Sequence, residues 1–171
     1  LHRDAGQLKT VAFLGRNSGV QMGGWFRNEI KALDDFKGLK MRMPGLGAEV
    51  INRMGATAVS MPGGEIMPSL ESGAIDATEW VGPYNDLAFG FYQVAKYYYG
   101  PGFHEPGTQA ECMVNKEEYD KLPKHLQKIV EHASVSENNK MLAEFTYGNS
   151  AAQRKLVDTH GVIMNNFPKE V

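Results

Sequence analysis

The segment 39–80 alternates between strand and helix patterns, and this alternation limits the fold more than any other feature of the chain. Strands are expected at 39–44, 57–62 and 74–80, and helices at 46–54 and 63–73. Each expected helix is followed or closed by a glycine, at Gly55 and Gly73, where a helix can end in a left-handed turn. Strands and helices that alternate across short turns are typical of parallel α/β units.

The flanks of this segment differ from it. Residues 9–14 read as a short apolar strand and 15–24 as a loop, while "ECMVN" is a further strand candidate. From Lys116 to Gly161 the pattern is almost entirely helical, and a helical region of about 35 residues needs a surface to lie against. We therefore expect an α/β ligand-binding lobe with hinge strands at 1–115 and a helical region at 116–171.

Composition excludes several classes of function. The net charge is -2, and no basic run carries interleaved aromatic residues, so nucleic acid is not an expected partner. No apolar run approaches the roughly 18 residues that a membrane span needs. The single cysteine, Cys112, excludes an intrachain disulfide and is expected to be buried and inert. The chain opens without an initiator methionine or a signal core, so we expect it to begin inside a longer protein.

Two motifs that could indicate catalysis are weak. The glycines at Gly45 and Gly47 form a GxG, but the third glycine of a dinucleotide site is absent, so a simple strand-to-helix turn explains them better. His104 and Glu105 are adjacent in a loop and could do acid–base work. No nucleophile accompanies them.

Arg42, Glu79 and Trp80 stand at the ends of expected parallel strands. Ligands of α/β proteins bind at this carboxyl edge, where a guanidinium can hold a carboxylate. A surface arginine whose stem packs on apolar neighbours is the equal alternative for Arg42. Successive strand residues point to opposite faces, so Glu79 and Trp80 can enter one pocket together only if the strand breaks there. The Gly82-Pro83 turn favours such a break.

The strings "DFKGLKMRMPGLGAEVINRMGATAVSMPGGEIMPSLESGAIDATEWVGPYNDLAFG" and "KYYYGPGFHEPGT" closely resemble the substrate-binding proteins of tripartite ATP-independent periplasmic (TRAP) transporters. The match is to the C-terminal half of the DctP-type family, nearest to the branch that binds 2-oxo acids and hydroxy acids. It implies a periplasmic-binding-protein type II-like α/β lobe, with a parallel or mixed sheet and flanking helices, followed by the long helical region. The chain is then a fragment of a two-lobed periplasmic protein that closes over a small carboxylate and delivers it to a TRAP membrane permease.

The resemblance also implies site residues. Arg42 would grip the ligand carboxylate, and Trp80 would line the pocket, with Tyr84 and Phe103 as further candidates for its wall. A sodium or calcium ion would bridge ligand and protein through Gln21, Trp80 and Glu105, with Glu79 beside them as a further ligand or a support. The helix at 124–160 can mediate dimerisation in this family.

Two alternatives remain open at this point. One is an enzyme that uses Glu79, Glu105 and His104 around a metal ion. The other is a ligand-sensing domain on the same fold. The residues leave open which carboxylate is bound, and they do not separate sodium from calcium because both ions accept oxygen ligands.

Overall fold

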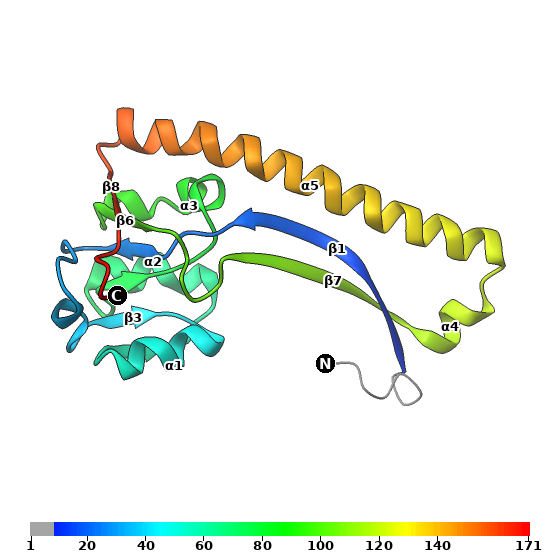
Figure 1. Cartoon of the computed structure of the whole chain (residues 1–171), viewed down its shortest axis with the longest axis horizontal. Coiled ribbons are helices and arrows are strands. Elements are labelled where there is room, and N and C mark those ends of the chain that lie inside the picture. The colour runs from blue at the N-terminus through cyan, green and yellow to red at the C-terminus, as the bar shows by residue number, and fades with distance from the viewer. Residues whose placement is uncertain (1–8) are drawn as a thin grey trace. The chain divides into compact units, whose positions relative to one another are not determined.

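The computed structural model describes residues 9–171 and contains two compact units (Figure 1). The described part of the first unit comprises residues 9–19 and 108–145, and the second unit comprises residues 20–107 and 146–171. The second unit thus takes its last residues from the region beyond residue 115, where the sequence predicts a separate helical part.

The second unit is built on a six-stranded sheet with the order β4–β3–β5–β2–β6–β8. The strands are β2 (Gly24–Phe26), β3 (Lys40–Arg42), β4 (Thr57–Val59), β5 (Ala77–Thr78), β6 (Tyr97–Gly100) and β8 (Ile163–Asn166). The helices are α1 (Gly45–Arg53), α2 (Gly63–Ser72) and α3 (Pro83–Phe89), with 3₁₀ turns at Leu33–Phe36 and Phe91–Gln93.

Five of these strands run in the same direction. β3 is parallel to β4 and β5, and β6 is parallel to β8. β2 lies between β5 and β6 and is antiparallel to both. Consequently the carboxyl ends of the five parallel strands and the amino end of β2 meet at one edge of the sheet.

The core of this unit has two apolar layers, one on each face of the sheet. Successive side chains of a strand point to opposite faces, so Trp25 and Phe26 of β2 belong to different buried clusters, as do Tyr98 and Tyr99 of β6. The Trp25 layer includes Ile66 and Leu70 of α2 and Leu156 near the chain's end, and the Phe26 layer includes Ile51 of α1. The sheet is therefore covered on both faces, as parallel sheets require.

One carboxylate lies within the Trp25 layer. Asp86 of α3 is only 1% exposed and accepts hydrogen bonds from the Trp25 indole at 2.9 Å and the Tyr98 hydroxyl at 2.7 Å. It also accepts the main-chain N–H groups of Val81 and Gly82, each at 3.1 Å. Burial raises the pKa of Asp86 to about 6, and these four hydrogen bonds oppose that rise.

The first unit contains a two-stranded sheet of β1 (Thr10–Val20) and β7 (Gly107–Asn115), followed by α4 (Lys116–Lys121) and the first part of α5 (Lys124–Asp158). Asn115 caps α4 by accepting the Glu118 N–H at 3.2 Å. The Phe13 ring of β1 packs on Tyr119 of α4, with ring centroids 5.2 Å apart. Within residues 9–171, no helix is both long and apolar enough to cross a membrane.

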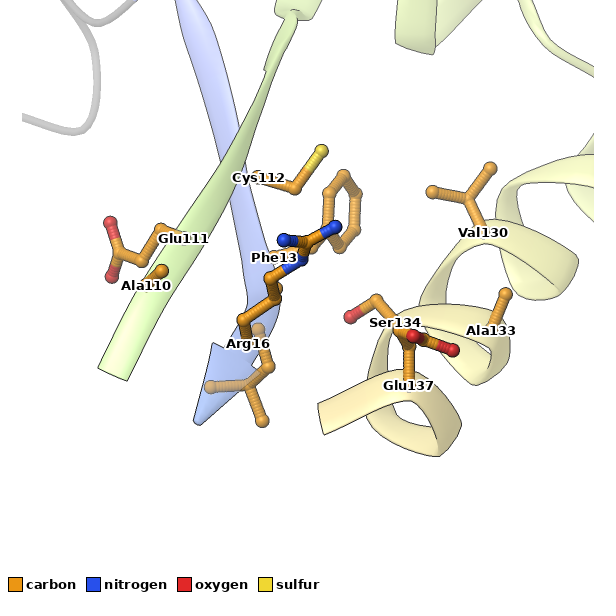
Figure 2. A pocket seen from close by; sticks show the side chains of 11 residues that line it. Phe13, Arg16, Ala110, Glu111, Cys112, Val130, Ala133, Ser134 and Glu137 are labelled. Carbon is orange, nitrogen blue, oxygen red and sulfur yellow. The ribbon is translucent and has the colours of Figure 1, made fainter. Parts of the chain in front are cut away.

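A hollow of about 530 Å³ lies within the first unit, between its two strands and α5. Figure 2 shows Phe13 and Cys112 on the strand side of this hollow and Val130 and Ala133 on the helix side. The prediction that Cys112 is buried is wrong, because the cysteine is exposed on β7.

The α/β fold class, with a mixed sheet and flanking helices, is confirmed, and so is a single long helix, since α5 has 35 residues. The loop predicted at 15–24 is wrong over most of its length, because β1 continues to Val20 and β2 begins at Gly24. Gly15 allows β1 to lie close to β7, because a Cβ there would be 3.1 Å from the Ala110 carbonyl oxygen. The sequence patterns also missed β8, which pairs with β6.

We expect replacement of Asp86 by asparagine to change how stability depends on pH. Because burial raises the pKa of Asp86 from 3.8 to about 6, the folded state binds more protons than the unfolded state between these values. The stability contributed by this group is therefore complete below pH ~4 and falls by about 3 kcal/mol as the pH rises past ~6.

Denaturant unfolding between pH 4 and 7 measures this directly. The free energy of unfolding of the wild type, minus that of Asp86→Asn, is expected to decrease across the window. A difference that stays constant with pH would contradict the assignment.

Candidate ligand-binding site

The polar residues predicted from the sequence gather at the edge where the parallel strands end. β3 ends at Arg42, and β5 ends one residue before Glu79, whose N–H donates to the Arg42 carbonyl oxygen at 3.1 Å. The segment before β2 reaches the same edge because β2 runs in the opposite direction. There the Met22 N–H donates to the Val81 carbonyl at 3.0 Å.

Arg42 and Glu79 form a buried ion pair. The Arg42 Nη1 donates both to the Glu79 Oε1 and to the Glu79 main-chain oxygen, the latter at 3.1 Å. Their side chains are 10% and 4% exposed, so the charges interact largely shielded from water. The Arg42 Nε is buried and has no hydrogen-bond partner among the described residues. An unpaired buried donor is costly unless something else binds it.

Trp80 lies against the same guanidinium. The Arg42 Cζ is 5.1 Å from the centroid of the Trp80 ring, within the range of a cation–π interaction. Since β5 ends at Thr78, the strand alternation stops there, and both Glu79 and Trp80 reach Arg42. Gly63 makes room for the indole, because a Cβ at that position would lie 2.7 Å from the Trp80 ring.

His104 joins this cluster from the other side of Glu79. Its side chain is 3% exposed, and its Nε2 lies 3.6 Å from the Glu79 Oε2. Neither ring nitrogen has a hydrogen-bond partner among the described residues. The sequence analysis singled out His104 only because it is adjacent to Glu105. It did not predict that His104 lies close to Glu79. Nothing in the local sequence marks that contact.

Gln21 and the segment of Glu105 are joined through the main chain. The Gln21 N–H donates to the Pro106 carbonyl at 3.1 Å, and the Gln21 carbonyl accepts the Gly102 N–H at 2.9 Å. A Cβ on Gly102 would lie between 2.9 and 3.1 Å from the carbonyl oxygens of Glu105, Gln21 and Met22. Gln21 is 3% exposed, whereas Glu105 is exposed.

Tyr84 and Phe103 lie in different surroundings. The Tyr84 N–H donates to Asn149 Oδ1 at 2.9 Å, and its ring packs on Gly148, where a Cβ would lie 2.8 Å away. The Phe103 ring contacts His104 and Phe167, with centroids 5.6 and 5.3 Å apart. Direct side-chain contacts therefore join Arg42, Glu79, Trp80 and His104. Phe103 borders this group through His104, whereas Tyr84 contacts α5.

The donor set suits a hard cation. Across residues 9–171, no cluster of three or more His, Cys, Asp or Glu side chains could hold a metal ion. The predicted set is of another kind: two carboxylates, Glu79 and Glu105, with the Gln21 amide and main-chain carbonyls. Sodium and calcium accept such mixed oxygen ligands. The space that Gly102 leaves open toward three carbonyl oxygens is compatible with an ion beside it.

Comparison with known proteins gives closely similar relatives. A monocarboxylate 2-oxoacid-binding periplasmic protein of Nostoc sp. is 46% identical over 150 residues, which are 88% of this chain and 41% of that protein. A TRAP periplasmic solute-binding protein of Colwellia psychrerythraea, solved with calcium and pyruvate, is 44% identical with a TM-score of 0.89, over 95% of this chain and 50% of that one. Its counterpart from Pseudoalteromonas atlantica, solved with sodium and pyruvate, is 42% identical with a TM-score of 0.86, over 95% and 49% of the two chains.

The chain thus spans about half the length of the relatives that it matches. The resemblance inferred from the sequence is confirmed. The model of bacterial extracellular solute-binding protein family 7, DctP, matches residues 2–171, and the chain belongs to that family.

Proposed function

We propose that this chain forms the part of a TRAP solute-binding protein that holds the carboxylate of a small 2-oxo or hydroxy acid. The observation that carries this proposal is the buried Arg42, with Glu79 on its Nη1, the Trp80 ring beside it and an Nε that lacks a partner among the described residues. A guanidinium fixed in this way can present its remaining N–H groups to a ligand carboxylate.

The charges of the site explain why a cation would accompany the ligand. Arg42 and Glu79 form a buried pair whose formal charges cancel. A ligand carboxylate would therefore add an uncompensated negative charge to a buried site, which is costly. A sodium or calcium ion supplies the compensating positive charge when it is bound. Gln21, Glu79, Trp80 (through its carbonyl) and Glu105 are the residues that would hold it.

The function proposed is capture rather than catalysis. Glu79 already accepts hydrogen bonds from Arg42, and the hydroxyl of the adjacent Thr78 donates to the Glu79 main-chain oxygen at 2.9 Å, which commits it to a structural contact. Relatives with this fold carry pyruvate together with calcium or sodium. We therefore propose a periplasmic receptor that binds its ligand on closure and delivers it to the membrane permease of a TRAP transporter.

We also propose that α5 carries a dimer contact. Its two most exposed large apolar residues are Ile129 at 58% and Tyr147 at 76%. They are 18 residues apart, about five helical turns, and so share one face of the helix. A helix of 35 residues also needs a surface to lie against, which a second copy of the helix can supply.

The arginine clamp is tested by Arg42→Lys, measured by calorimetric titration with pyruvate and calcium in the whole protein that contains this chain. Lysine keeps the charge that Glu79 needs but loses the planar fork. We expect affinity to fall by about 10- to 100-fold, the cost of losing charge-assisted hydrogen bonds.

The matched control for that variant is Arg53→Lys. Arg53 is an exposed arginine of α1 paired with Glu49, away from the site, and its replacement is expected to leave affinity unchanged. Equal affinities for Arg42→Lys and the wild type would refute the clamp.

The cation is tested by titrating pyruvate with and without calcium or sodium. Removing both ions is expected to weaken binding by about 5- to 150-fold, the usual range of coupling between two ligands. Glu105→Gln should raise the calcium concentration needed for half-maximal binding, whereas Glu111→Gln, on exposed β7, should not. If the affinity for pyruvate is the same with and without either ion, the proposed cation site is contradicted.

The dimer contact is tested by Ile129→Asp, which places a charge on the proposed face of α5. Sedimentation should show a shift toward monomer relative to the wild type, because a buried unpaired charge opposes association. Gln153→Glu adds one charge at an exposed position of the same helix that lies about 120° around it from Ile129, and it is the control for the added charge. A wild type that is monomeric at every concentration would disprove the contact.

A further inference from the structure

We infer that Asp86 is a positioning residue for the ligand site: its carboxylate fixes the turn that carries Trp80 by holding the next two main-chain N–H groups. The inference rests on the proposed function, since it concerns how that site keeps its geometry. Asp86 itself touches neither Arg42 nor Glu79 through any described hydrogen bond.

One oxygen of Asp86 faces the turn. Its Oδ1 accepts the N–H of Val81 and the N–H of Gly82, both at 3.1 Å. These two groups follow Trp80 directly in the chain, so their position sets where the Trp80 carbonyl and ring can lie. The Val81 carbonyl in turn accepts the Met22 N–H at 3.0 Å. The turn therefore also fixes the segment that begins with Gln21.

The other oxygen faces the sheet. Oδ2 accepts the Trp25 Nε1–H at 2.9 Å and the Tyr98 O–H at 2.7 Å. These two rings are stacked with centroids 3.9 Å apart, and both residues are fully buried. Burial and the neighbouring carboxylate raise the pKa of Tyr98 well above 10, which keeps its hydroxyl a donor. The carboxylate thus joins the turn to two strands that cannot easily move.

A carboxylate matches all four donors of this geometry. Four donors converge on one side chain, and only an ionised Asp or Glu offers acceptors in every direction with no competing donor. Stability alone does not explain its presence: burial raises the pKa of Asp86 to about 6, so the carboxylate, although mostly ionised at pH 7, costs more free energy there than it would in water. The carboxylate supplies acceptors for the two N–H groups that follow Trp80. An apolar side chain could not supply them.

The two oxygens allow the positioning role to be separated from the stabilising one. Asp86→Ala removes both sets of hydrogen bonds. Tyr98→Phe is the matched control, because it removes a hydrogen bond to Oδ2 and leaves the Oδ1 bonds to Val81 and Gly82 in place. Asp86→Asn is the conservative variant, since its amide oxygen can still accept both N–H groups of the turn. Its NH₂ loses the hydrogen bond from the Trp25 indole but can donate to the Tyr98 hydroxyl.

Two measurements apply to these variants. Hydrogen exchange in this chain reports on the turn: protection of the Val81 and Gly82 amides is expected to fall at least about tenfold in Asp86→Ala and to be kept in Tyr98→Phe and Asp86→Asn. Calorimetry of the whole protein reports on the site: pyruvate affinity in calcium is expected to fall about tenfold or more in Asp86→Ala. It should stay within about threefold of wild type in the two other variants.

The outcomes separate this inference from the proposed function. If the wild type binds no small carboxylate, the proposed function fails, and the exchange measurement still decides whether Asp86 holds the turn. If the wild type binds pyruvate but Asp86→Ala and Tyr98→Phe lose equal affinity at matched stability, the positioning role is overturned. Should Asp86→Ala fail to fold, Asp86→Ser, whose short side chain cannot span turn and sheet, takes its place with the same expectations.

Discussion

The direction of β2 is the constraint on which the candidate site depends. Five strands of the sheet run one way, and β2, between β5 and β6, runs the other way. A sheet of parallel strands alone would place at its carboxyl edge only the residues that follow strands. The reversed strand adds the residues that precede it, including the buried Gln21. The guanidinium at the end of β3 and the amide that precedes β2 thus lie at one edge of the sheet without a long loop.

The second constraint on the candidate site is the pairing of the Arg42 and Glu79 charges. A buried ion pair such as Arg42–Glu79 contributes little stability compared with an apolar pair of the same size, because both groups lose their hydration. Under the function proposed above, the value of the pair would lie in keeping a guanidinium in place for a ligand carboxylate. Glu79 contacts the arginine through a hydrogen bond and Trp80 through its ring, so the guanidinium is held in position by its own neighbours.

The sequence predicts the regular part of the fold and identifies most of the residues at the site edge. Helical spacing and terminal glycines locate α1 and α2, and strand patterns locate β3 and β4. The strands that were missed are short: β2 is "GWF", buried throughout, and β8 is "IMNN", and neither shows the apolar–polar alternation that marks a half-buried strand. For the same reason the contact of His104 with Glu79 could not be foreseen, since it depends on which loops these short strands bring together.

Gly148 shows how unevenly a long surface helix tolerates change. Glycine in the interior of a helix costs about 1 kcal/mol relative to alanine, yet α5 keeps one where the Tyr84 ring of α3 lies against it. The adjacent Asn149 accepts the Tyr84 N–H and so caps the start of a second helix. Apart from buried residues such as Leu156, much of α5 can change in sequence as long as it remains helical. Gly148 and Asn149 are more constrained, and substitutions there would disturb the turn that carries Trp80.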